Sequence, residues 1–84
     1  MKTDNDTNQP VDYDQTGDGQ PFGKSPCKGT LAASASRVFP PCGQPPWVVT
    51  FTLADGRKVS SRPLVAAEAG ATVTLRPDET VVVA

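Results

Sequence analysis

The stretch that decides the fold is Trp47-Val48-Val49-Thr50-Phe51-Thr52-Leu53. Its odd positions are all large and apolar, whereas Thr50 and Thr52 fall on the other face of an extended chain. A period of two is typical of a β-strand with one buried face. The pattern therefore predicts a strand whose core residues are Trp47, Val49, Phe51 and Leu53.

The residues that follow this strand predict a hairpin turn at Ala54-Asp55-Gly56. A three-residue loop with Gly56 in the left-handed conformation pairs Phe51 with Val59 and keeps apolar residues together. A two-residue loop would pair Phe51 with Ser60 and would move charge onto the apolar face. We therefore predict the three-residue loop.

A second hairpin is expected over residues 72–83. Val73 and Leu75 alternate with threonines, and Arg76-Pro77-Asp78-Glu79 has Pro at the second position of a turn. The return strand then pairs Leu75 with Val81 and Val73 with Val83. Residues 67–70 between the two hairpins are expected to form a further turn.

Residues 30–39 are rich in Ala and Ser and fit either a short helix or a strand. We favour a strand, in which one face carries Leu31, Ala33, Ala35, Arg37 and Phe39. The Pro-Pro pairs at 40–41 and 45–46 exclude helix around them. The predicted fold class is all-β, a small antiparallel meander of about five strands that forms a compact barrel or sandwich.

Residues 1–21 have a different composition, dominated by Asp, Asn, Gln, Thr and Gly. Such a segment buries too little apolar surface to offset the entropy lost on ordering. We therefore predict a disordered acidic tail over residues 1–21 and a single small β domain over residues 22–84. Val11, Tyr13 and Phe22 are the apolar side chains through which the tail would contact a partner.

Charge is divided unevenly along the chain. Residues 1–18 hold five acids and one base, a net charge of −4, whereas residues 19–84 hold four acids and seven bases, a net charge of +3. The candidate basic surface consists of Arg57, Lys58, Arg62 and Arg76. A body charge of +3 beside an acidic tail is far from the balance of nucleic-acid-binding domains, so nucleic acid is not the expected partner.

The two cysteines, Cys27 and Cys42, both lie next to Pro. A disulfide between them would close a loop worth about 3 kcal/mol, a large contribution for so small a domain. The N-terminal sequence does not resemble a secretory signal peptide, and a reducing cytosol would keep both thiols free. A disulfide and two buried free thiols both remain open at this point.

Catalytic and metal sites are not predicted. The chain has no His, and no Ser lies in a Gly-x-Ser-x-Gly turn. Two thiolates cannot complete a zinc site alone. Residues 12–18 resemble the start of a calcium loop, but Gly23 stands where the bidentate Glu should be. We therefore expect a protein that is not an enzyme and has no metal or cofactor.

The expected function is non-catalytic binding or assembly, in which a small β module docks on a larger protein. An accessory structural component of a virus or phage particle would suit such a module, alone or as a homo-oligomer. One alternative is an inhibitor or anti-defence protein whose acidic tail blocks a basic site, and another is a weak single-stranded nucleic-acid binder. Synthesis in the cytoplasm without membrane insertion is expected, because the longest apolar runs are far too short to span a bilayer.

Overall fold

The computed structural model describes all 84 residues and is almost entirely β-structure. Its elements in chain order are β1 (Lys2–Asn5), β2 (Val11–Gly17), β3 (Lys28–Leu31), β4 (Ser36–Val38), β5 (Trp47–Thr52), β6 (Lys58–Ser60), the 3-10 helix η1 (Ala66–Glu68), β7 (Thr72–Leu75) and β8 (Val81–Val83). No helix in the structure has the length and apolar character needed to cross a membrane.

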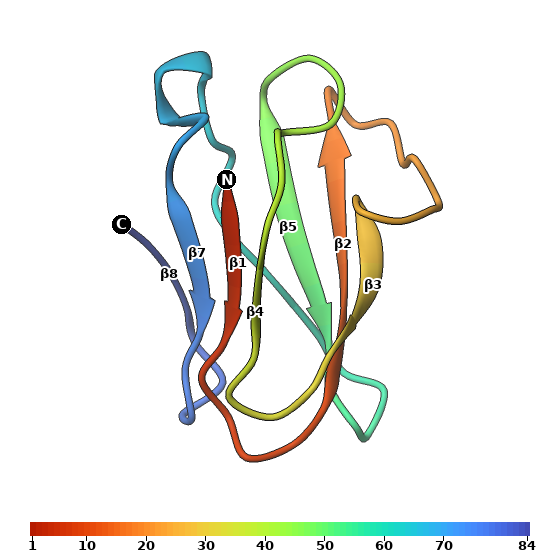
Figure 1. Cartoon of the computed structure of the whole chain (residues 1–84), viewed down its shortest axis with the longest axis vertical. Helices are drawn as coiled ribbons and strands as arrows, with labels where there is room; N and C mark the ends of the chain where they lie inside the picture. Colours follow the sequence, from red (N-terminus) through yellow and green to blue (C-terminus); the bar gives the residue numbers. More distant parts are fainter.

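The strands form two four-stranded sheets that pack face to face (Figure 1). The strand order is β4-β1-β7-β8 in the first sheet, called sheet A here, and β3-β2-β5-β6 in the second, called sheet B. All neighbours are antiparallel except β1 and β7, which run parallel. The all-β prediction is confirmed. The simple antiparallel meander of about five strands is wrong, because eight strands are present and the chain crosses between sheets.

Both sheets contribute to one hydrophobic core. Its central residues are fully or almost fully buried: Tyr13, Val49, Phe51, Leu64, Val73 and Leu75. The predicted pairs Phe51 with Val59, Leu75 with Val81 and Val73 with Val83 are confirmed. Gly56 has a φ of 90°, as the three-residue loop requires.

The predicted disordered tail is wrong. Strand β1 lies between β4 and β7 in sheet A, and β2 lies between β3 and β5 in sheet B. Along β2 the side chains alternate, so Tyr13 and Gln15 are buried while Asp12 faces solvent. The boundary at residue 22 therefore divides one folded unit, and residues 12–18 form a strand with a turn after it, not a calcium loop.

Buried hydrogen bonds explain how so polar a segment folds. Asn5 is fully buried, and its Nδ2 donates to the carbonyl oxygens of Gln9 at 2.8 Å and Ala32 at 3.1 Å. Its Oδ1 accepts from the backbone N–H and the hydroxyl of Thr7. A buried amide that is satisfied in this way avoids most of the desolvation penalty. Asn5 thereby ties the β1–β2 loop to the β3–β4 turn.

The single strand predicted over residues 30–39 is also wrong. The segment forms β3 and β4, which belong to different sheets, and residues 32–35 cross between them. Ser34 has a φ of 59°, in the left-handed region that an extended strand does not use. Leu31 and Phe39 are buried, but Ala33 is exposed, so the five residues do not share one face.

Candidate interaction surface

Three loops meet at one end of the sandwich, drawn uppermost in Figure 1. They join β2 to β3 (residues 18–27), β4 to β5 (residues 39–46) and β6 to β7 (residues 61–71). We call this surface the disulfide end. The opposite end, called the turn end, holds the β1–β2 loop and the turns of the two predicted hairpins.

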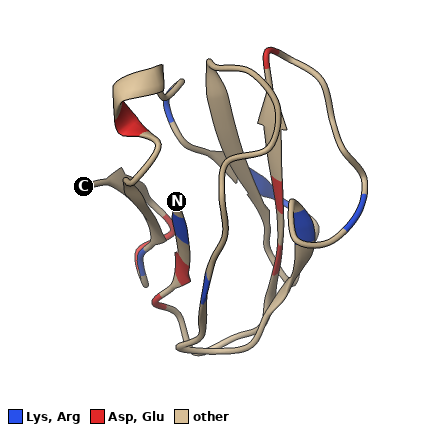
Figure 2. Ribbon diagram, turned by 45° about the horizontal axis from the view of Figure 1, so that its top comes forward, with Lys and Arg blue, Asp and Glu red and all other residues tan.

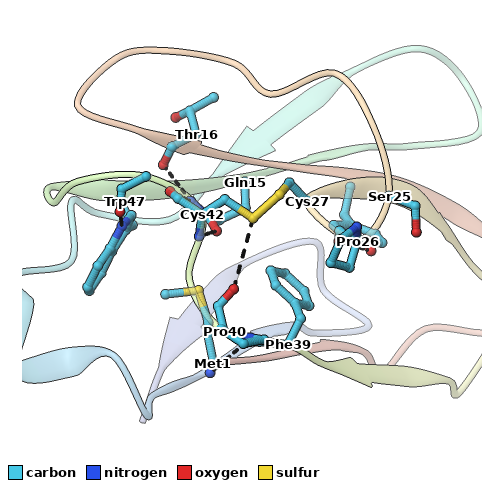
Figure 3. The surroundings of a disulfide bond; sticks show 12 residues. Met1, Gln15, Thr16, Ser25, Pro26, Cys27, Phe39, Pro40, Cys42 and Trp47 are labelled. Carbon is cyan, nitrogen blue, oxygen red and sulfur yellow. Dashed lines mark hydrogen bonds between the residues drawn. A yellow bond between two sulfur atoms is a disulfide. The ribbon is translucent and has the colours of Figure 1, made fainter.

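A disulfide joins two of the loops at the disulfide end. Cys27 and Cys42 are bonded, with 6.2 Å between their Cα atoms, and no cysteine is free. Figure 3 shows the bridge between the segment that follows β2 and the segment that precedes β5. The question left open by the sequence is therefore resolved in favour of the bridge.

Gln15 holds both halves of the bridge to β2 (Figure 3). Its backbone N–H donates to the carbonyl oxygen of Cys27 at 2.7 Å. Its side-chain Oε1 accepts from the N–H of Cys42 at 2.7 Å, and its Nε2 donates to the carbonyl oxygen of Cys42 at 3.1 Å. Because Gln15 is fully buried, these bonds work without competition from bulk water.

Two aromatic residues fasten the same loops to the sheets. The Tyr13 hydroxyl donates to the Pro26 carbonyl oxygen at 2.5 Å and accepts from Arg37 Nη1 at 3.1 Å. The indole Nε1 of Trp47 donates to the Gly43 carbonyl oxygen at 3.1 Å. Buried aromatic residues with a polar group commonly satisfy that group in this way. The loop backbone is therefore fixed at several points.

Two glycines allow the loops to approach one another closely. A Cβ atom on Gly17 would lie 2.5 Å from the carbonyl oxygen of Cys42, so only glycine fits at the end of β2. A Cβ atom on Gly43 would lie 2.6 Å from Cζ of Phe22, and Gly43 has a φ of 73°. The Phe22 ring thus lies over the backbone of the β4–β5 loop.

The disulfide end carries two of the four exposed large apolar side chains of the protein. Phe22 is 41% exposed and Val65 is 57% exposed. Contacts beneath the surface link the two loops: Phe22 covers Gly43, and the Gly43 carbonyl oxygen accepts a hydrogen bond from Trp47. The backbone of Trp47 pairs with that of Leu64, and both of these side chains are buried. Exposed residues that extend this surface are Pro21, Pro26, Pro40, Pro46, Ala66 and Ala67.

Charge at this end is sparse. Residues 39–46 contain no charged side chain. Arg62 donates to the Glu68 carboxylate from Nη1 at 2.9 Å and from Nη2 at 2.5 Å. The Arg62 bonds, together with the N–H of Val65, lower the pKa of Glu68 to about 2. This ion pair leaves Asp18 and Lys24 as the other charged residues of the three loops.

The residues predicted as tail contacts lie in different environments. Val11 and Tyr13 are buried in the core of the protein itself and offer no surface to a partner. Phe22 is exposed at the disulfide end. Val11 and Tyr13 are therefore not available as tail contacts, and contact of a partner with Phe22 stays a prediction. A sequence signal for the rest of this surface is the apolar run Leu64-Val65-Ala66-Ala67, which lies between β6 and β7 and continues into η1.

The predicted basic surface is divided between the two ends. Arg57, at the turn end, forms ion pairs with Asp55 and with Glu79 at 2.6 Å, and the Arg57 backbone N–H is the main cause of the lowered pKa of Asp55. Arg62 lies at the disulfide end, paired with Glu68. Figure 2 shows acidic and basic positions interspersed over the ribbon. Lys58 and Arg76 are exposed without a paired carboxylate.

A hollow of about 230 Å³ lies at the turn end, between the β1–β2 loop and the two hairpin turns. Its lining includes Thr7, Gln9, Leu53, Arg57 and Glu79. The charged side chains there are engaged with one another, and the hollow is small beside ordinary ligand sites of about 300–1,000 Å³. A second hollow of about 410 Å³ lies beside it, but its lining contains no hydrophobic residue, whereas ligand sites are mostly apolar. The disulfide end is therefore the stronger candidate surface.

Comparison of the chain with protein-family models, with curated proteins and with solved structures finds no significant match.

Proposed function

We propose that this chain is a non-catalytic protein-binding module that docks on its partner through the disulfide end. The observation that carries the proposal is the pair of exposed apolar side chains Phe22 and Val65 at one end of the sandwich, where the Cys27–Cys42 bridge joins two of the three loops. Exposed apolar surface that is fixed in place marks an interaction site more often than scattered single residues do.

The way the loops are held favours binding. A surface that is already ordered loses little conformational entropy when a partner covers it. The disulfide, Gln15 and Trp47 hold two of the three loops before any partner arrives. Aromatic side chains are enriched in the centres of protein interfaces, and charged ones are depleted there. Phe22 and the uncharged loop of residues 39–46 fit that composition.

The alternatives from the sequence have less support. The inhibitor hypothesis needs a free acidic arm, but Asp4, Asp12 and Asp14 lie on paired strands. The nucleic-acid hypothesis needs a basic groove, and two of its four bases are in ion pairs. A role in a larger assembly, including a virus or phage particle, remains a prediction about the identity of the partner.

The experiment uses a photo-crosslinking amino acid placed at single exposed positions in the protein expressed in its own cells. Position 22 or position 65 should yield crosslinks to a protein partner. Position 60, on the outer face of β6, is the matched control and should yield none. Crosslinks to the same partner from position 60 alone would contradict docking through the disulfide end.

Binding of the purified partner then tests the energetics. Phe22→Ala should weaken binding by about tenfold or more, the effect typical of an interface residue worth at least 1.4 kcal/mol. Ser60→Ala should bind as the unmodified protein does. Equal affinity of all three proteins would overturn the proposal.

A further inference from the structure

The four edge strands of the sandwich differ in how they are protected against pairing with other chains. The edges are β4 and β8 in sheet A, and β3 and β6 in sheet B. An edge strand presents unpaired N–H and C=O groups, which proteins usually guard with charges, prolines or covering loops. An edge strand without any of these devices is free to pair with a strand of another chain.

Three of the edges carry a charged residue. Arg37 of β4 is paired with the buried Thr3, and its Nη1 reaches Tyr13 and Ser25, which closes the corner between β4 and β3. Lys28 begins β3, and Lys58 begins β6. Each charge would have to be desolvated or displaced if another strand paired there.

Strand β8 has none of these devices. It consists of Val81, Val82 and Val83, and it is the outermost strand of sheet A in Figure 1. Val81 and Val83 are partly buried against the core, whereas Val82 is 40% exposed on the outer face. β-Branched residues are the strongest strand formers, so this edge is both apolar and already extended.

The hydrogen-bond pattern directs free backbone groups outward from β8. Thr72 and Ala84 exchange two backbone bonds, and the Arg76 N–H donates to the Thr80 carbonyl oxygen. Because bonded and non-bonded pairs alternate in an antiparallel ladder, Val82 is the bonded residue between them. The N–H and C=O of Val81 and Val83 therefore point away from β7, toward the open edge.

We propose that β8 pairs antiparallel with β8 of a second copy of this chain, about a two-fold axis at Val82. Val81 of each copy then lies opposite Val83 of the other, and these residues exchange four backbone hydrogen bonds. The two sheets A become one eight-stranded sheet. The two Val82 side chains meet on the outer face at the closest pair position, with Cα atoms about 4.5 Å apart.

A second copy is the occupant that this edge fits, because a two-fold interface must be complementary to itself. The strand carries no charge, so two copies meet without like charges facing each other. All three residues of β8 are Val, so the antiparallel arrangement places Val opposite Val at every position. Three residues make a small interface, below about 1,000 Å², so the dimer should be weak, with a dissociation constant on the order of 0.1–1 mM.

Cysteine crosslinking tests the geometry in the full, oxidised chain. In the proposed dimer the two Cα atoms at position 82 lie about 4.5 Å apart, within the range of about 4.4–6.8 Å that a disulfide needs. The two thiols of Val82→Cys can therefore form a disulfide. Mild oxidation should therefore convert this variant into a covalent dimer. Val38→Cys is the matched control, because Val38 is exposed on the same outer face but on the other edge strand, β4. It should remain monomeric, and equal crosslinking of both variants would overturn the proposal.

Sedimentation velocity from micromolar to millimolar concentration tests the equilibrium. The unmodified protein should shift toward dimer at the top of this range. Val82→Lys places like charges opposite each other and should weaken the dimer by about tenfold or more. Val38→Lys adds the same charge on β4 and should dimerise normally. A protein that stays monomeric at about 1 mM, or a dimer that Val82→Lys leaves unchanged, would contradict pairing through β8.

Discussion

Strands β2 and β5 are neighbours along six residue pairs, from Asp12 with Thr52 to Gly17 with Trp47, yet their sequences have little in common. The inward side chains of β5 are Trp47, Val49 and Phe51. Those of β2 are Val11, Tyr13 and the amide Gln15, which is held by hydrogen bonds. The strand ends at Gly17, where close backbone packing leaves no room for a side chain. A central strand can therefore be held by buried polar contacts as well as by apolar area.

The largest expected effect comes from removing β1, whose buried residues Thr3 and Asn5 are polar like Gln15 of β2. Deleting residues 1–10 removes β1, which leaves β4 and β7 without their shared neighbour. The shortened chain should show no cooperative unfolding transition by circular dichroism. Asp4→Asn and Asp12→Asn, which change outward residues of β1 and β2, should stay within about 0.5 kcal/mol of the unmodified protein. If the shortened chain still folds cooperatively, residues 1–10 are dispensable for folding, as a disordered tail would be.

The apolar side of the comparison is tested at Phe51, which is fully buried opposite Tyr13. Phe51→Ala should lower the free energy of unfolding by about 3–5 kcal/mol, through lost burial and a cavity. Urea denaturation measures the change. Thr52→Ala, at the next position on the outer face, should change it far less, and similar losses at both positions would contradict the alternation.

The disulfide joins the two regions, since Cys27 follows β2 and Cys42 precedes β5. Reduction should lower the free energy of unfolding by about 3 kcal/mol, because the unfolded chain regains the entropy of an open loop. The melting temperature with and without reductant reports this loss. The double variant Cys27→Ser and Cys42→Ser should melt low under both conditions. An unmodified protein insensitive to reductant would show that the bridge adds nothing to stability.

Gln15 provides a test of the polar contacts within β2. Gln15→Ala leaves the Cys42 N–H without its acceptor and should reduce the free energy of unfolding by about 1–3 kcal/mol. Gln20→Ala, which changes an exposed amide just beyond β2, is the matched control and should have little effect. If both variants lower the melting temperature equally, the hydrogen bonds of buried Gln15 do not stabilise the fold.

The smallest expected effect is the pH dependence of Glu68. Its pKa is lowered from 4.5 to about 2 by Arg62 and the Val65 N–H. A carboxylate with a lowered pKa contributes stability above its ordinary pKa and loses it as the pH falls. The stability difference between the unmodified protein and Glu68→Gln should therefore shrink from pH 4.5 toward pH 2. A difference that is constant over this range would exclude Glu68 as its source.

The hairpin of β5 and β6 and that of β7 and β8 could be predicted with their registers, because apolar alternation and turn residues agree there. Strand β2 carried a weaker form of the same signal, since Val11 and Tyr13 alternate with Asp12 and Asp14. Strand β1 carried none, because its buried residues Thr3 and Asn5 are polar, and Asn5 reaches the Ala32 carbonyl oxygen, which is distant in sequence. At the candidate surface, the sequence indicated Phe22 only as a contact of a disordered tail, whereas the exposure of Val65 depends on a loop position that only the fold reveals.

The pairing of Lys2 with Thr72 has a consequence for how the chain is made. Strand β1 is made before its parallel neighbour β7, and at about 5–20 residues per second it waits several seconds for that strand. While it waits, Lys2-Thr3-Asp4-Asn5 remains hydrated and offers little for other nascent chains to adhere to. The valine-rich edge of β8 is made after β7, when its place beside that strand is ready.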